Sequence, residues 1–313
     1  MKNSENKIIF IPFYAQAPQH RSAASARIRA EWPAKYLNAD IADKKTTIKD
    51  LSNYNFVIFQ KCYSSKFYVM ARAIKEESNG DLRIGLDLCD PIWLERPEDF
   101  MWMSFIVDFF TVPTEKMKEE LRKKFNDESK KIYVIPDGHD LEYYNTDYVI
   151  HDESNLMRYI WYGNSGTIKS LQAIMPYLEH WAGSSDTLTI IADKMAQGAI
   201  SSEKLVIKFV PWDLETVNQE VKKCNIALNP RLNTPEYAVK SNNKTAMAYI
   251  LGLPCIDLSV DKKDEWNNKL INLKLPENRI ADVKEKRQYY IDNFRMEKIA
   301  EIWEKVLAKE VKK

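Results

Sequence analysis

Residues 241–256 read Ser-Asn-Asn-Lys-Thr-Ala-Met-Ala-Tyr-Ile-Leu-Gly-Leu-Pro-Cys-Ile, which is a polar turn, a short helical run, a glycine and the start of a strand. Ser241 is a typical N-terminal helix cap, and Gly252 suits the left-handed position that ends a helix. Lys244 falls in the first turn, where unpaired backbone N–H groups and the helix dipole favour an anion such as a diphosphate. An ordinary turn with a solvated lysine is the alternative interpretation.

The bulk composition is that of a soluble globular protein. The 313 residues are enough for two domains, 45% are hydrophobic and 29% are charged. A net charge of +1 argues against a nucleic-acid partner bound through overall charge. No apolar run reaches the roughly 20 residues of a membrane span, and the N-terminus does not resemble a signal peptide, so a cytoplasmic location is expected. The four cysteines form no Cys-x-x-Cys pair, which argues against a zinc site or a disulfide framework.

Short apolar runs alternate with helical patterns along the whole chain. In the first half, strands are predicted at 8–13, 56–60, 82–88, 108–112 and 131–135, with helices at 25–37, 66–77 and 114–125. After a polar stretch at 144–155 the pattern restarts, with strands at 157–161, 187–191, 205–210, 226–229 and 254–258. This alternation is typical of parallel sheets covered by helices on both faces.

Two turns in the second half bring glycine and lysine to the ends of strands, which is where doubly wound folds bind ligands. The turn at 161–167 is followed by a helix with Lys169 in its first turn, and the turn that begins at Ser241 contains Lys244. Two helix N-termini with two lysines suit a nucleoside diphosphate. A tryptophan at another strand end could stack on the base, although a buried tryptophan is equally expected there. The predicted nucleotide-binding residues are Gly163, Asn164, Lys169, Trp212, Ser241, Asn242 and Lys244.

Two carboxylates and two arginines in the first half are candidates for catalysis and for acceptor binding. Asp87 and Asp90 lie at the end of a predicted strand, where a carboxylate could act as a base on an acceptor hydroxyl, and they are the predicted catalytic residues. A helix cap or a buried charge pair is the alternative, and two carboxylates are too few to predict a metal site. Arg27 and Arg29, on the first predicted helix, are predicted to bind a phosphate or an anionic acceptor. A plain salt bridge is equally open for both arginines.

Three segments in order resemble a known family. Residues 241–256 resemble the late motif of the retaining GT-B glycosyltransferases of family 4, which is a polar turn, a helix with a glutamate and Gly-x-Pro-Val-Ile. Residues 135–144, Ile-Pro-Asp-Gly-His-Asp-Leu-Glu-Tyr-Tyr, are similar to the interdomain Ile-Pro-Asn-Gly-Val-Asp segment of that group. Residues 160–163 resemble the first strand and turn of its second domain. The chain departs from the pattern at Met247, where a donor-binding glutamate is expected, and it lacks the glycine-rich turn of the first domain.

The resemblance implies an α/β protein with the GT-B fold, which has two Rossmann-like doubly wound domains and an interdomain cleft. Residues 1–145 would form an acceptor domain, residues 156–280 a nucleotide-sugar donor domain, and residues 281–313 a helix that packs back toward the first domain. The implied activity is transfer of a sugar from a nucleotide-diphosphate sugar to a carbohydrate or lipid-linked acceptor, with retention of configuration. No cofactor other than the donor substrate is implied.

Two other functions stay open on the same fold. A sugar-nucleotide 2-epimerase would need the same phosphate site but no acceptor, and a non-catalytic binding module is favoured by Met247 in place of the glutamate. The charged stretch at 116–124 predicts at most a weak association with a membrane surface, because its acidic residues nearly match its basic ones.

Overall fold

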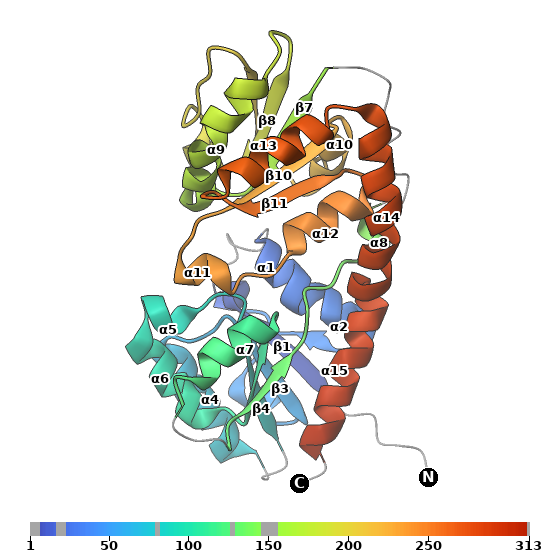
Figure 1. The fold of residues 1–313 in the computed structure, drawn as a ribbon. Coiled ribbons are helices and arrows are strands. Elements are labelled where there is room, and N and C mark those ends of the chain that lie inside the picture. Colours follow the sequence, from blue (N-terminus) through green and yellow to red (C-terminus); the bar gives the residue numbers. More distant parts are fainter. Residues whose placement is uncertain (1–6, 17–22, 79–81, 126–128, 145–155, 312–313) are drawn as a thin grey trace. The chain divides into compact units, whose positions relative to one another are not determined.

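The computed structural model describes residues 7–16, 23–78, 82–125, 129–144 and 156–311. The chain divides into two compact units (Figure 1). Unit 1 comprises Met1–Asp140, Ala238–Ser241 and Phe294–Lys313, and unit 2 comprises Leu141–Tyr237 and Asn242–Asn293. The boundaries expected at 145, 156 and 280, and the acceptor and donor roles, stay predictions. The linker expected at 144–155 lies almost wholly outside the described residues.

Unit 1 contains a six-stranded sheet in the order β2-β1-β3-β4-β5-β6, and every neighbouring pair is parallel. Pro12, Gln60 and Asp87 are paired across β1, β3 and β4, so these three strands end level at one edge of the sheet. The strands are β1 (Ile8–Pro12), β2 (Asp40–Ile41), β3 (Phe56–Gln60), β4 (Arg83–Asp87), β5 (Phe109–Val112) and β6 (Lys131–Val134).

The first long helical segment of unit 1 contains a wide turn. It runs through α1 (Ala24–Ala26), the π turn η3 (Arg27–Glu31) and α2 (Trp32–Leu37), and the Trp32 N–H bonds to the Arg27 carbonyl five residues back. Pro33 has no N–H and its ring would crowd the carbonyl four residues back in a regular α-helix, so a wider turn suits the sequence here. The turn directs Arg27 and Arg29 into the interior, where they are 6% and 2% exposed.

The last helix of the chain, α15 (Met296–Val311), belongs to unit 1 and lies beside α2 (Figure 1). Trp303 packs edge-on against Phe10 of β1 at 5.4 Å between ring centroids. Glu310 is 1% exposed and accepts hydrogen bonds from Lys131 and Tyr133 of β6. The other helices of unit 1 are η1 (Phe13–Gln16), α3 (Ile48–Leu51), α4 (Ser65–Glu77), α5 (Ile92–Glu95), α6 (Pro97–Ile106) and α7 (Glu115–Arg122).

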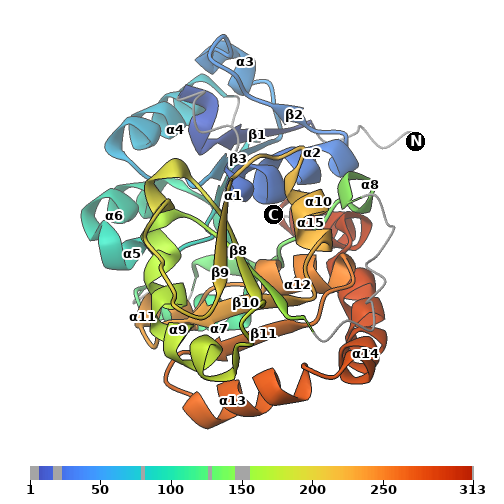
Figure 2. The ribbon, with the colours of Figure 1, turned by 90° about the horizontal axis from the view of Figure 1, so that it is seen from above.

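Unit 2 contains a five-stranded parallel sheet in the order β11-β10-β7-β8-β9. Figure 2 shows α12 and α13 on opposite sides of β10 and β11. The strands are β7 (Arg158–Tyr162), β8 (Thr187–Ala192), β9 (Val206–Pro211), β10 (Ile226–Arg231) and β11 (Cys255–Ser259).

The helices of unit 2 cover both faces of its sheet, and the core includes Trp161, Leu171 and Trp266, each no more than 1% exposed. Two parallel sheets covered by helices confirm the predicted α/β class. The helices are α8 (Leu141–Tyr144), η4 (Ser165–Thr167), α9 (Ile168–Trp181), η5 (Lys194–Ala196), α10 (Val217–Lys222), α11 (Pro235–Ala238), α12 (Asn243–Ile250), α13 (Lys263–Asn272) and α14 (Pro276–Phe294), and the last residues of α11 and α14 count with unit 1. Within the described residues, no helix is both long enough and apolar enough to span a membrane.

Candidate functional site

The turn that follows β7 needs a glycine for packing. A Cβ at Gly163 would lie 2.5 Å from the Trp161 ring and 2.9 Å from the Thr167 hydroxyl. Asn164 then caps the helical start, because its side chain accepts the Thr167 N–H at 3.1 Å. The predicted turn is therefore present, with Asn164 exposed to solvent.

A carboxylate is already hydrogen-bonded at the N-terminal end of the helical segment formed by η4 and α9. Asp193, which follows β8, accepts the Ser165 backbone N–H at 2.7 Å, and this hydrogen bond holds the pKa of the Asp193 carboxyl below its usual range. A phosphate at this helix start would meet a negative charge in place of an unpaired donor. Lys169 is exposed on the first turn of α9. The start of α9 is therefore less suited to a diphosphate than the sequence indicates.

The start of α12 has a different character. Asn242, not Ser241, is the N-cap residue, and within the described structure its side chain makes no capping hydrogen bond. The predicted cap at Ser241 is wrong, because Ser241 Oγ donates instead to Asp137 at 2.5 Å, within unit 1. Gly252 ends the helix as predicted, with φ of 86°, and the Leu253 N–H returns to the Ala248 carbonyl.

The structure brings Lys244 to the turn after β7. Its Nζ lies 5.2 Å from the centroid of the Trp161 ring, and its backbone carbonyl accepts the Tyr162 hydroxyl at 2.5 Å. The same Trp161 ring excludes a Cβ at Gly163. Gly163 and Lys244, 81 positions apart in the sequence, thus both lie beside the Trp161 ring in unit 2.

A charged cluster under the first turn of α12 was missed by the sequence analysis. Arg231, the last residue of β10, makes a bidentate ion pair with Asp257 at 2.5 and 2.8 Å. Thr245 donates to the same carboxylate at 2.5 Å and accepts from Asn229 at 3.1 Å. The cluster fixes the first turn of α12 to β10 and β11. The only signal for it in the sequence is a charged residue at a strand end.

Trp212 and Met247 are two further positions in unit 2 that the sequence singles out. Trp212 follows β9 at the edge of the sheet, where its N–H bonds to the Ala192 carbonyl at 2.8 Å. Its partly exposed side chain lies two strands away from β7, so the structure does not bring it to Lys244. Met247 is 8% exposed on α12. A thioether at this place has no charge to offer a ribose hydroxyl.

In unit 1 the predicted residues Arg29 and Asp87 pair with each other. The guanidinium contacts Asp87 at 2.5 and 3.1 Å, Asp137 at 3.2 Å and the Ile135 carbonyl at 2.5 Å. Thr111 also donates to Asp87, which is 0% exposed. Burial disfavours the charged form of Arg29, but Asp87 and Asp137 raise the pKa of Arg29 above its ordinary value. This buried network fits the charge-pair alternative better than catalysis or acceptor binding.

Asp90 and Arg27 occupy different surroundings in unit 1. Asp90 is 30% exposed and pairs with Lys61 at 2.6 Å. Burial raises the pKa of Asp90, but the charge and hydrogen bond of Lys61 reverse the direction, so that its pKa lies below the usual range. Arg27 is buried, with its guanidinium carbon 5.2 Å from the Trp32 ring centroid. Of these two residues, Asp90 is the one that solvent reaches.

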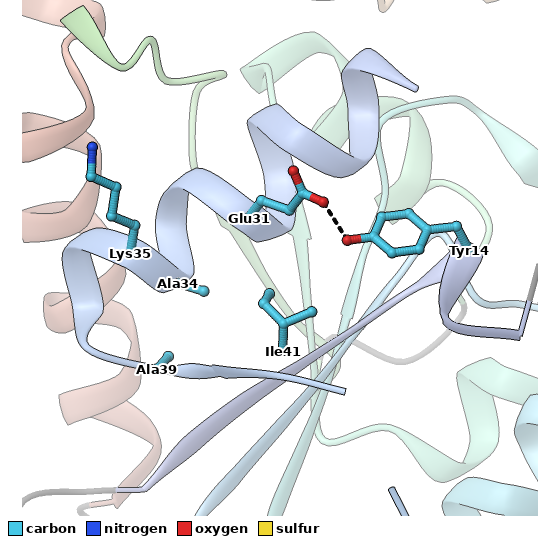
Figure 3. A pocket seen from close by; sticks show the side chains of 6 residues that line it. All are labelled: Tyr14, Glu31, Ala34, Lys35, Ala39 and Ile41. Atoms are coloured by element: carbon cyan, nitrogen blue, oxygen red, sulfur yellow. Dashed lines mark hydrogen bonds between the residues drawn. The ribbon is translucent and has the colours of Figure 1, made fainter. Parts of the chain in front are cut away.

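Unit 1 also contains a hollow that the sequence did not predict (Figure 3). Its volume is about 390 Å³, and Tyr14 donates a hydrogen bond to Glu31 on its wall. The lining residues are Tyr14, Glu31, Ala34, Lys35, Ala39 and Ile41. None of the predicted site residues lines it. Among the described residues, no group of three or more His, Cys, Asp or Glu side chains is placed to hold a metal ion.

Solved structures resemble the whole chain at low sequence identity. HepE of Anabaena (Alr3699), solved with UDP and glucose, is 10% identical with a TM-score of 0.68, and the match covers 97% of this chain and 100% of that chain. An α-glucosyltransferase solved with UDP and a 13-mer DNA containing an HMU base is 8% identical with a TM-score of 0.68, over 98% and 99% of the two chains. The chain has the GT-B fold.

The comparisons reach no further than the fold. No family model and no curated protein matches the sequence, so membership of the retaining family 4 stays a prediction. A structure named for UDP-N-acetylglucosamine 2-epimerase, from Listeria monocytogenes, is 11% identical with a TM-score of 0.50, over 97% of both chains. The fold by itself therefore fits both a transferase and an epimerase.

Proposed function

We propose that the chain is a glycosyltransferase that uses a nucleoside-diphosphate sugar as donor and a carbohydrate or lipid-linked acceptor. Unit 2 would bind the donor and unit 1 the acceptor. The observation that carries the proposal is the start of α12, where Lys244 is held by Trp161 and Tyr162 beside the glycine turn after β7. Solved structures of the same fold contain UDP, so UDP is the first nucleotide to test.

The chemistry follows from where charge develops. As the bond between the sugar C1 and the diphosphate oxygen breaks, negative charge grows on the leaving diphosphate. The Lys244 ammonium and the N–H groups of the α12 start would stabilise that charge, which lowers the barrier because the interaction strengthens in the transition state. The acceptor oxygen forms the new bond to C1 and loses its proton to a base. Retention of configuration rests on the resemblance to family 4 alone, and it requires the acceptor oxygen to approach C1 from the face that the diphosphate leaves.

Asp90 is the better candidate for contact with the acceptor hydroxyl. Its carboxylate is 30% exposed, whereas that of Asp87 is fully buried and bonded by Arg29 and Thr111. A base must lie within hydrogen-bond reach of the proton that it takes, which a closed network prevents. We therefore assign the proposed role to Asp90 and a structural role to Asp87.

A ligand screen tests the donor site first. Binding to the native state raises the melting temperature, so UDP, GDP, dTDP and ADP, each with and without a sugar, are compared by thermal shift. We expect one nucleotide series to stabilise the protein, and Lys244→Ala to lose most of that shift. If no nucleotide raises the melting temperature at millimolar concentration, the proposed donor site is wrong.

Acceptor-dependent turnover separates the transferase from its alternatives. With the stabilising donor, a transferase releases nucleoside diphosphate faster when a mixture of candidate glycans is added. An epimerase converts the donor at the same rate with or without acceptor, a possibility that the Listeria monocytogenes structure keeps open. A binding module, favoured by the uncharged Met247, binds the nucleotide and leaves it intact.

A further inference from the structure

Lys61 has an unusual backbone conformation. Among the described residues, two that are not glycine have left-handed φ angles, Asn38 at 50° and Lys61 at 56°. Asn38 ends α2, where a left-handed residue is usual and asparagine tolerates it. Lys61 follows β3, and a lysine in this region is strained by contact between its Cβ and the following carbonyl oxygen. Such strain is found most often at functional sites.

The turn itself explains the backbone but not the lysine. The Lys61 N–H donates to the Asp87 carbonyl at 2.9 Å, and the next residue, Cys62, is fully buried with its Sγ 3.3 Å from the Ile11 carbonyl. Glycine or asparagine would make the same turn at lower cost. The side chain of Lys61 therefore needs an explanation of its own.

The amine of Lys61 reaches Asp90. Its Nζ lies 2.6 Å from Asp90 Oδ2, and the two side chains are 29% and 30% exposed, so a ligand can approach the pair. The Phe13 ring centroid is 5.9 Å from the same Nζ. An ammonium donor, a carboxylate acceptor and an apolar ring together match the surface of a sugar, which offers hydroxyl groups and C–H faces.

We propose that Lys61 is the positioning residue for Asp90 and that the two side chains hold a hydroxyl-rich acceptor. This inference rests on the proposed glycosyl transfer. Asp90 accepts the hydrogen of the reacting hydroxyl, and the proton passes to its carboxylate as the oxygen bonds to the sugar C1 and the bond from C1 to the diphosphate oxygen breaks. Lys61 donates to a neighbouring hydroxyl, and its 2.6 Å ion pair holds the carboxylate in position. The strained turn after β3 is what aims the amine at Asp90.

The electrostatic surroundings of the pair agree with this role. The groups that act on Asp90 are Lys61 from the turn after β3, Cys89 beside it in the chain and Lys240 from the segment before α12. Tyr63 also interacts with Lys61. Burial raises the pKa of Asp90, and the two lysines lower it. Removal of the Lys61 amine should therefore raise the pKa of Asp90.

The experiment separates the amine from the backbone. Lys61→Ala and Lys61→Gly both remove the amine, but only glycine relieves the left-handed strain, so the glycine variant should melt about 2–4 °C higher than the alanine variant. Both should lose about tenfold in kcat with acceptor, and the acid limb of their pH profile should move to higher pH. Asn38→Ala and Asn38→Gly are the matched controls, with the same order of melting temperatures and unchanged activity.

Each outcome decides the proposal. The proposal is supported if both Lys61 variants lose kcat equally and carboxyl NMR shows a raised pKa of Asp90. The nucleotide-induced thermal shift should stay normal in both variants. Full kcat and an unchanged pH profile in Lys61→Gly overturn it while the proposed glycosyl transfer stands. If the wild-type protein binds a nucleotide but transfers its sugar to no acceptor, this inference and the proposed transferase activity are both wrong.

Discussion

The polar residues at the ends of the strands have opposite surroundings in the two sheets. At the end of β4 in unit 1, Asp87 is closed inside a network with Arg29 and Asp137, each at most 5% exposed. At the end of β7 in unit 2, Asn164 is exposed and Lys244 lies partly exposed over an aromatic ring. In the sequence, Asp87 and Asn164 are both polar residues at or just after the end of an apolar strand. Burial therefore decides which set stabilises the fold and which set is open to a ligand.

The largest expected effect comes from breaking the buried network. Arg29→Met leaves Asp87 and Asp137 without their common partner, and a buried charge that loses its partner costs about 3–5 kcal/mol in unfolding free energy. Urea denaturation measures this loss. The matched control is Arg72→Met on α4, because the exposed Arg72–Glu76 pair, at 2.7 Å, is screened by solvent and its loss should leave the stability nearly unchanged. A stable Arg29→Met protein that fails only in acceptor turnover would restore the predicted role in acceptor binding.

A second prediction concerns the pH dependence of unit 1. Burial lowers the pKa of His139, which is 1% exposed, to about 3 from an ordinary value of 6.5, and Arg27 adds to the effect. The unfolded chain then binds a proton that the native protein excludes. The contribution of neutral His139 to the free energy of unfolding is therefore fully present above pH 6.5. It declines as the pH falls toward 3, by about 2 kcal/mol at pH 5.

Thermal unfolding between pH 7 and pH 5 measures this decline. His139→Gln should flatten the profile, whereas His180→Gln, a change at an exposed position on α9, should leave it as in the wild type. A profile that stays steep in His139→Gln would assign the decline to other groups.

The smallest effects compare two lysines within unit 2. Lys244→Ala should weaken nucleotide affinity about tenfold, because it removes a charge from a helix start that has no side-chain cap. Lys169→Ala should change the affinity by less than about twofold, because Asp193 already bonds at the start of α9. Isothermal titration with the nucleotide found in the thermal screen measures both. If Lys169→Ala weakened nucleotide affinity more than Lys244→Ala does, the diphosphate site would lie at the start of α9 and the proposed site would be wrong.

Most strands follow directly from the sequence. Phe56–Gln60 is predicted to the residue, and the strand cores at Ile8, Thr187 and Ile226 begin where expected, because a strand buried on both faces is a continuous apolar run. The helices α5, α6 and α13 were missed, and so were the short helices α3, α8 and α11. In α6, Met101, Trp102 and Phe105 are exposed at 52–68% opposite a buried face, so apolar residues surround the helix and no amphipathic period marks it.

The site is less predictable than the sheets, and the reason is specific to each residue. The spacing of Ser241 and Lys244 predicts a helix start but not that Ser241 bonds to Asp137, 104 positions away. The Lys244 environment depends on Trp161 and Tyr162, which the sequence presents only as strand residues. The left-handed Lys61 carries no local signal, since glycine or asparagine is the usual mark of that conformation.

The division of the chain into two units decides which unit is completed first during translation. Unit 1 starts at the N-terminus, yet its core includes Trp303 of α15, which packs on Phe10, and its last strand is bonded to Glu310. Unit 2 ends at Asn293. On the ribosome, therefore, the unit that begins second is the first to have all its residues released. The sheet of unit 1 is therefore complete, with Phe10 covered by Trp303, only after α15 has been released.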